Sequence, residues 1–341
     1  MMRACLLTAA VLAVFAWAPP QVSVAGAADA RVLRIATLLP RSRDSVRDLK
    51  KWNKQLASAT GGQLKVRMYW GGVAGDEVTV LRKMKAGQLD GATLSTVGLG
   101  QVVRAVQLFN APGLINNAKQ LDALQAEFEQ HFNERFHKAG FHVAGWGEAG
   151  HTRLFSTNAI KRPSDLKARR PWAWTIDAAF PSFLKVVGAN GVKLGVPEVM
   201  TALQTGMVDT LVASATVVWA LQWYPKLKYM SQQANGFVLG ALIFKREAYD
   251  AIPPDLAATL QKTASERNKD SRKRARARDR KAFKILAKQG IEPVSIDGHR
   301  AEWEKSSKQA RQKLVGKLYP KEMLTRAESL LSKIDGTPDA N

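Results

Sequence analysis

Hydrophobic and polar residues in the first part of the chain follow patterns typical of alternating strands and helices. Residues 31–37 and 63–70 have the alternation of strands, whereas residues 44–58 and 76–87 have the spacing of helices. This β-α-β-α-β order predicts a mainly parallel sheet. Further along, the pattern predicts an extended segment from Phe141 to Ser156.

Two helix-strand units of similar sequence recur 119 residues apart. In each unit a glycine, Gly87 or Gly206, ends a helix, and a short apolar strand then ends at Ser95 or Ser214. A matched unit in each half predicts an α/β fold with two lobes. Ligands of open α/β sheets bind beyond the carboxyl ends of strands, so we predict a binding cleft between the lobes. A chance recurrence of Gly-x-Leu/Val-Asp is the alternative.

The pattern in the later part of the chain predicts a strand that returns to the first lobe and a long basic helix. Residues 236–244 are expected to form a strand that returns to the first lobe, and one helix is expected from Pro254 to Gln289, before Gly290. The densest basic run of the chain, residues 267–284, lies within this helix. A solvated basic face is the favoured interpretation. Attraction to an anionic membrane surface or an acidic partner stays open.

The N-terminal residues 1–27 are predicted to be a secretory signal peptide. Arg3 precedes an apolar run too short to span a bilayer, and small residues ending at Ala27 are typical of a cleavage site. The single cysteine, Cys5, lies within this segment, which excludes disulfides and thiolate chemistry from a mature chain of about 314 residues (341 minus 27). Net charge is +22, or +21 without Arg3. We therefore expect a periplasmic protein that does not bind nucleic acid.

No motif in the chain indicates catalysis, a metal or a cofactor. Residues 145–150 match G-x-G-x-x-G, but extended chain follows where a dinucleotide site needs a helix. The sequence has no H-E-x-x-H and no G-x-S-x-G pattern. We predict that the protein is not an enzyme and holds no cofactor or metal.

Tryptophans gather near the ends of predicted strands. Trp70 ends a strand, Trp172 and Trp174 flank a loop, and Trp219 and Trp223 follow the strand that ends at Ser214. A tryptophan offers a large apolar face and one N–H donor, which suits a pocket wall. Packing in an ordinary core is the alternative for any one of them.

Three stretches resemble the substrate-binding proteins of TRAP transporters, the DctP family. They are Gly150-His151-Thr152-Arg153, residues 160–167 (IKRPSDLK) and residues 196–209 (VPEVMTALQTGMVD), and their order and spacing match across nearly the whole mature chain. The resemblance implies a two-lobed periplasmic binding protein whose long helix bridges both lobes. It also implies delivery of a solute to the membrane permease subunits of an ion-coupled transporter.

Two positions depart from the pattern of that family. Trp172 stands where the family places an arginine that pairs with a substrate carboxylate, and Ala213 replaces an asparagine. Arg153 matches the arginine of the family's G-x-R stretch and is expected either to contact an anion or to form a structural ion pair. These changes favour an aromatic or amphipathic ligand over a small dicarboxylate. An organic acid is the alternative.

The resulting prediction is a periplasmic solute receptor with a cleft that closes around its ligand. Lobe one is assigned residues 28–148 and 237–285, lobe two residues 149–236 and 286–334, and residues 335–341 form a tail. Two alternatives are a carrier of a hydrophobic molecule or lipid that works with an accessory periplasmic protein, and a polyanion- or membrane-surface-binding protein. The predicted ligand-binding residues are Leu39, Pro40, Trp70, Ser95, Thr96, Arg153, Phe155, Trp172, Trp174, Ala213, Ser214 and Trp219.

Overall fold

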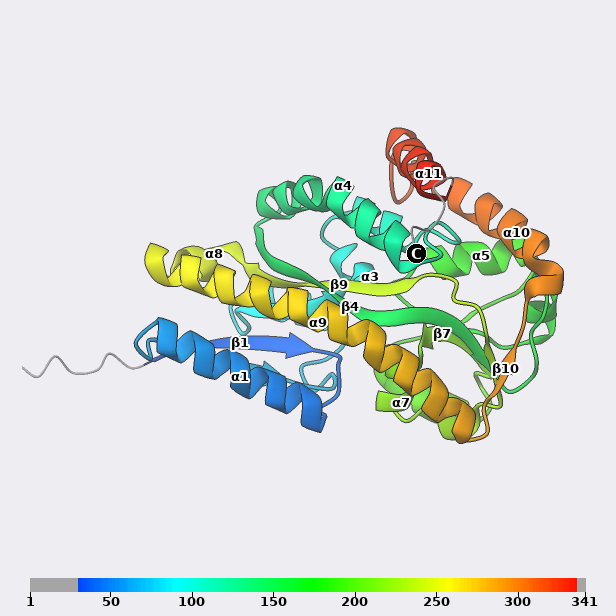
Figure 1. The fold of residues 1–341 in the computed structure, drawn as a ribbon, viewed down its shortest axis with the longest axis horizontal. Helices are drawn as coiled ribbons and strands as arrows, with labels where there is room; N and C mark the ends of the chain where they lie inside the picture. Colours follow the sequence, from blue (N-terminus) through cyan, green and yellow to red (C-terminus); the bar gives the residue numbers. More distant parts are fainter. Residues whose placement is uncertain (1–29, 336–341) are drawn as a thin grey trace, which may run out of the picture.

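The computed structural model describes residues 30–335 and has two α/β lobes that share strands and one long helix (Figure 1). The predicted signal peptide and all but the first residue of the predicted tail lie outside the described residues. The prediction of a two-lobed α/β fold with a bridging helix is confirmed. Within residues 30–335, no helix combines the length and the apolar character needed to cross a membrane.

Strands and helices alternate along most of the chain. The strands are β1 (Arg31–Thr37), β2 (Leu64–Tyr69), β3 (Gly91–Ser95), β4 (Phe141–Ser156), β5 (Trp172–Trp174), β6 (Val192–Leu194), β7 (Thr210–Ser214), β8 (Tyr229–Ser231), β9 (Phe237–Lys245) and β10 (Glu292–Val294). The α-helices are α1 (Arg43–Ala59), α2 (Glu77–Lys85), α3 (Thr96–Leu99), α4 (Ala118–Lys138), α5 (Ala179–Val187), α6 (Val199–Gln204), α7 (Ala215–Ala220), α8 (Arg246–Asp250), α9 (Pro254–Lys288), α10 (Arg300–Gln312) and α11 (Lys321–Asp335). Short 3₁₀ helices are η1 (Arg104–Asn110), η2 (Pro163–Ala168), η3 (Val196–Glu198), η4 (Tyr224–Lys226) and η5 (Asp297–His299).

One mixed sheet runs through both lobes in the order β10-β8-β4-β9-β3-β1-β2, with β7 paired to β4. β1 pairs in parallel with β2 and β3, as the β-α-β-α-β order predicts. β9 runs antiparallel to β3, and β4 runs antiparallel to β7, β8 and β9. The prediction of a mainly parallel sheet is therefore wrong for the sheet as a whole. Two features make the sheet mixed: β9 enters between β3 and β4 with reversed direction, and β4 runs antiparallel to β7 and β8.

Strands β4 and β9 connect the two lobes. The first part of β4 pairs with β9, and its last five residues, from Thr152 to Ser156, pair with β7 of the second lobe. β9 then pairs with β3 in the first lobe. Figure 1 shows these two long strands crossing the middle of the molecule. They form the connection about which the lobes can move relative to each other.

The repeated helix-strand units have the predicted conformation. Gly87 and Gly206 have φ values of +71° and +73°, the left-handed geometry that favours glycine after a helix. The serine at the end of each following strand caps a short helix. Ser95 accepts a hydrogen bond from Gly98 N at 3.3 Å, and Ser214 accepts one from Val217 N at 3.2 Å.

The glycines of the G-x-G-x-x-G match lie within β4, and Gly145 and Gly150 allow close packing against α9. Gly150 has a φ of +99°, and a Cβ atom there would lie 2.4 Å from the Asp279 carboxyl on α9. That carboxylate accepts hydrogen bonds from His151 N and Thr216 N. No helix begins at these glycines, so the match does not have the geometry of a dinucleotide site.

Helix α9 lies along one face of the molecule and contacts both lobes (Figure 1). Toward its first half, Thr263 accepts a hydrogen bond from the indole of Trp52 on α1 at 3.2 Å. Toward its second half, Asp279 binds Thr216 at the start of α7. At an α-helical rise of about 1.5 Å per residue, a helix of 35 residues is long enough to span both lobes.

Each lobe has apolar cores on both faces of its sheet. In the first lobe, aromatic residues of α4 pack with Trp146 on one face, and Trp52 packs with Leu260 on the other. In the second lobe, Phe155 and Trp223 belong to one core, and Phe183 stacks on Trp303 in another. These cores fix the strand ends that face the cleft.

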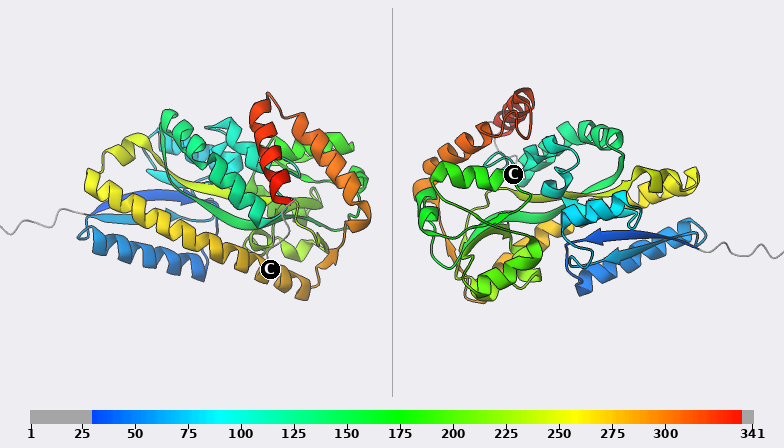
Figure 2. Two further views of the ribbon diagram at one scale, coloured as in Figure 1. Left: turned by 45° about the horizontal axis from the view of Figure 1, so that its top comes forward. Right: turned by 180° about the vertical axis from the view of Figure 1, so that it is seen from behind.

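The C-terminal helix α11 packs on the first lobe. Leu324 and Leu331 of α11 belong to the same core as Phe128 of α4, and Arg326 pairs with Glu127 on that helix. Figure 2 shows α11 lying over α4 and leading from α10. The lobe boundaries stay a prediction. These contacts favour assigning the last turns of the chain to lobe one and not to lobe two.

Candidate ligand-binding site

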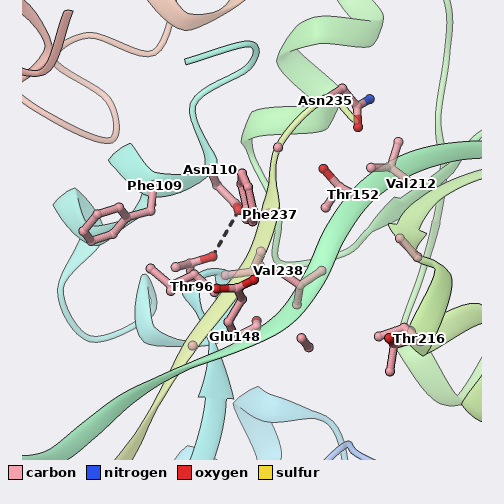
Figure 3. A pocket seen from close by; sticks show the side chains of 18 of the residues that line it. Thr96, Phe109, Asn110, Glu148, Thr152, Val212, Thr216, Asn235, Phe237 and Val238 are labelled. Atoms are coloured by element: carbon pink, nitrogen blue, oxygen red, sulfur yellow. Dashed lines mark hydrogen bonds between the residues drawn. The ribbon is translucent and has the colours of Figure 1, made fainter. Parts of the chain in front are cut away.

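A cavity of about 770 Å³ lies between the two lobes. The first lobe supplies the loop after β1, Trp70 after β2, the junction of β3 and α3, and η1. The second lobe supplies β5, β7 and the start of α7, and the connecting strands β4 and β9 cross the cavity (Figure 3). The cavity thus lies beyond strand ends, where α/β folds bind their ligands.

Polar groups from both lobes face this cavity. Thr96 donates a hydrogen bond to Asn110 Oδ1 at 3.1 Å, so this pair is fixed on the first-lobe side. Thr152 and Thr216 line the second-lobe side (Figure 3). The Oδ1 atom of Asn235, which also lines the cavity, is buried without a hydrogen-bond partner. The site therefore offers hydroxyl and amide groups to a polar solute.

Four carboxyl groups line the cavity; Glu304 is exposed, and the other three carry less negative charge than their number implies. Burial raises the pKa of Glu77 to about 8, although Ser95 donates to it from N and Oγ at 2.8 Å, so it is mostly protonated at pH 7. Burial also raises the pKa of Asp177. Glu148 has a side chain with no exposed surface, burial raises its pKa, and it forms an ion pair with Arg276 at 3.0 Å. The wall is therefore not strongly acidic.

Eight of the predicted ligand-binding residues line the cavity. They are Leu39, Pro40, Trp70, Ser95, Thr96, Trp172, Trp174 and Ala213. Leu39, Pro40, Trp70, Ser95 and Thr96 end or follow a strand, which is why the strand pattern was sufficient to find them. Their direct contact with a solute stays a prediction.

Four predicted residues do not line the cavity: Arg153, Phe155, Ser214 and Trp219. Phe155 is fully buried in the core of the second lobe, and Ser214 is fully buried as the cap of α7. Trp219 is partly exposed on α7 and stacks on Tyr224 with 4.9 Å between ring centroids. These side chains belong to packing and to the outer surface of the second lobe.

Arg153 is turned away from the cavity by the alternation of strand β4. Thr152 and Leu154 line the cavity, whereas the Arg153 guanidinium lies 4.6 Å from the ring centre of Phe283 on α9. Its Nη1 atom donates to the carbonyl oxygens of Ser231 and Gln232. Because neighbouring residues of a strand face opposite sides, the Arg153 side chain faces α9 and not the cavity, and its Nε atom is buried without a hydrogen-bond partner. A contact between Arg153 and an anion stays a prediction.

Trp172 packs as a core residue at the edge of the cavity. Its side chain is 7% exposed, its indole N–H donates to Leu194 O at 3.0 Å, and its ring meets Trp223 edge to face at 5.6 Å. Trp174, in contrast, donates from Nε1 to Asp76 Oδ2 at 3.1 Å, across the cleft. The geometry of Trp172 does not support its predicted role as an open aromatic platform.

The sequence reasoning missed several cavity residues. Asn110 and Asn235 lie in segments without a motif, Glu148 and Thr152 lie within stretches noted for other reasons, and Arg267 lies inside the basic run of α9. For Thr152, strand alternation next to the G-x-R stretch was an available signal. The others required the three-dimensional structure. Within residues 30–335, no cluster of three His, Cys, Asp or Glu side chains is arranged to hold a metal ion.

Comparison with known proteins identifies relatives across most of the chain. The 2,3-diketo-L-gulonate-binding periplasmic protein YiaO of Escherichia coli K12 is 21% identical over 248 residues, which is 72% of this chain and 75% of YiaO. A TRAP periplasmic solute-binding protein from Ralstonia eutropha H16 with bound (S)-2-acetolactate has a TM-score of 0.81 and 20% identity, covering 89% of this chain and 99% of its own. A second, from Sulfurospirillum deleyianum with bound succinate, has a TM-score of 0.81 and 18% identity, covering 88% and 98%.

A family profile agrees with these relatives and with the resemblance found in the sequence. The profile is described as bacterial extracellular solute-binding protein, family 7 (DctP), and it matches residues 35–318. The match covers most of the chain, including both lobes and the bridging helix. The chain therefore belongs to the DctP family of bacterial extracellular solute-binding proteins.

Proposed function

We propose that this protein is a periplasmic receptor that binds a small organic acid and delivers it to the membrane permease of a TRAP-type transporter. The observation that carries the proposal is the cavity of about 770 Å³ between two lobes of this fold. Relatives of the same fold hold acetolactate or succinate, and another relative is named for 2,3-diketo-L-gulonate. All three compounds are small acids.

The geometry favours this receptor over the alternatives drawn from the sequence. A preference for an aromatic solute depended on an accessible Trp172 ring, and that ring is packed against Trp223. A lipid carrier or a membrane-surface protein has no counterpart among the named ligands of the three relatives. The hydroxyl and amide groups of the cavity wall offer hydrogen bonds to a compact polar solute.

A thermal-shift screen of the purified mature protein would test the proposal. The panel should contain small mono- and dicarboxylic acids, each beside its neutral amide. A ligand at 100 times its Kd stabilises the folded state by about 2.7 kcal/mol, which gives a clear rise in Tm. We expect at least one acid to raise Tm while its amide does not. If no acid raises Tm and neutral or aromatic solutes do, the proposed substrate class is wrong.

A further inference from the structure

Arg267 on α9 is a basic residue of the cavity wall with no acidic partner. The described lining residues include two arginines, Arg267 and Arg300, and Arg300 is exposed and pairs with Asp297 at 2.7 Å. Among the described residues, no carboxylate forms an ion pair with Arg267. The Asp48 carboxylate raises the pKa of Arg267 but forms its ion pairs with Arg274 and Arg278, each at 3.8 Å.

The guanidinium of Arg267 is held in place by packing. It lies over the ring of Trp52, 4.9 Å from the ring centre, and the Trp52 indole is itself fixed by its hydrogen bond to Thr263. The Nε atom of Arg267 is buried without a hydrogen-bond partner. Since its position is fixed by the ring, this donor is presented in a defined direction at little entropic cost on binding.

Asn268, the next residue of α9, has a second donor without a partner. Its side chain is 8% exposed, it lines the same cavity, and its Nδ2 atom is buried without a hydrogen bond. Buried polar groups are nearly always satisfied, so two adjacent unsatisfied donors on one wall require an explanation. A ligand with acceptor oxygens would satisfy both.

The surrounding charges favour an anion at this point. Burial lowers the pKa of Arg267, the Asp48 carboxylate acts in the opposite direction, and the guanidinium groups of Arg274 and Arg278 lower the pKa further. The net shift is downward and disfavours an isolated cation, and a bound anion would offset it. The Asp48 carboxylate does not neutralise Arg267, because it lies within ion-pair distance of Arg274 and Arg278.

We propose that Arg267, assisted by Asn268, binds the carboxylate of the solute from the bridging helix α9. This inference depends on the proposed organic-acid function and specifies it. Within the described lining, Arg267 is the single cation without an acidic partner, so one carboxylate is accommodated and a second one is not. The substrate class is therefore a monocarboxylate whose remaining groups are neutral.

Two matched comparisons test this anchor by titration calorimetry. The first uses succinate and monomethyl succinate, which differ by one charge, alongside the best acid from the thermal-shift screen. The second uses Arg267→Met and Arg267→Lys, with Arg280→Met as control because Arg280 lies on the same helix, exposed and outside the cavity. We expect Arg267→Met to weaken the best acid at least about tenfold, Arg267→Lys to weaken it less, and Arg280→Met to leave Kd unchanged.

Asn268→Asp provides a test that does not remove the arginine. The new carboxylate would add a negative charge to the cavity wall beside Arg267 and should weaken acid binding at least about tenfold through charge repulsion. If Arg267→Met and Asn268→Asp both bind the acid within twofold of the unmodified protein, or if succinate binds more tightly than its monoester, the anchor is wrong and the organic-acid function stands. If no acid binds the unmodified protein, both proposals are overturned.

Discussion

Trp174→Phe should weaken solute binding, because it removes a hydrogen bond that joins the two lobes. The Trp174 indole on the second lobe donates to Asp76 at 3.1 Å, and Asp76 begins α2 of the first lobe. Asp76 is held in position because its Oδ1 atom accepts the Glu77 N–H at 2.8 Å. Phenylalanine keeps an aromatic ring in the wall and removes only the donor.

The size of the effect follows from the kind of bond. A hydrogen bond to a charged group contributes about 1.5–3 kcal/mol net, and both side chains are partly exposed, so the lower end applies. A bond that forms only when the lobes are closed stabilises the closed state by that amount. About 1.5 kcal/mol corresponds to roughly tenfold in Kd.

Calorimetry with the best acid and small-angle scattering of the ligand-free protein would measure both consequences. We expect a roughly tenfold weaker Kd and a larger radius of gyration for Trp174→Phe. Trp219→Phe is the matched control, since Trp219 is on the same lobe outside the cavity. Equal affinity and equal scattering for Trp174→Phe and the unmodified protein would refute the contribution of this bond to closure.

Three further predictions follow from buried groups and from the surface of the second lobe. Because the pKa of Glu77 is raised from 4.5 to about 8, stability should fall as pH rises through that window, and Glu77→Gln should flatten Tm measured between pH 5 and pH 8. Arg276→Met should lower the free energy of unfolding in urea by about 3 kcal/mol, because it leaves Glu148 buried without its partner. Adding Glu148→Gln should restore much of this loss, and equal stability of the single and double variants would argue against the ion pair as its cause. Trp219→Ala should leave Kd within about twofold, since it is outside the cavity, and a larger loss would bring it back into the site.

Most of the fold could be predicted from the sequence because its elements have strong local patterns. The helix now bounded as Pro254–Lys288 was expected to end before Gly290, and the glycines Gly87 and Gly206 correctly marked the ends of two helices. The direction of β9 could not be predicted in the same way. A strand has the same alternation in either direction, so only pairing with β3 and β4 reveals that it is antiparallel.

The candidate site was predicted only in part, because position at a strand end is encoded locally and facing direction is not. Trp70 and Ser95 line the cavity because the ends of β2 and β3 face it. Arg153 has the residue type of an anion ligand but lies on the wrong face of β4, and a shift of one residue decides this. The G-x-R stretch places an arginine on β4 but does not determine which face of the strand that arginine occupies.

The basic helix illustrates the same limit for charge. Residues 267–284 suggest one solvated basic face, and the structure divides their cations between different environments. Arg276 pairs with Asp122 and Glu148, Lys273 and Lys284 are exposed, and Arg267 faces the cavity without a carboxylate. Arginines at neighbouring turns of a helix look alike in a sequence. Arg267 differs from Arg276 because it forms no ion pair with an acidic residue of a neighbouring element. The partners of Arg276 come from α4 and β4, so this difference between the two arginines exists only in the folded protein. A functional cation in a basic run is therefore recognised by its surroundings and not by its motif.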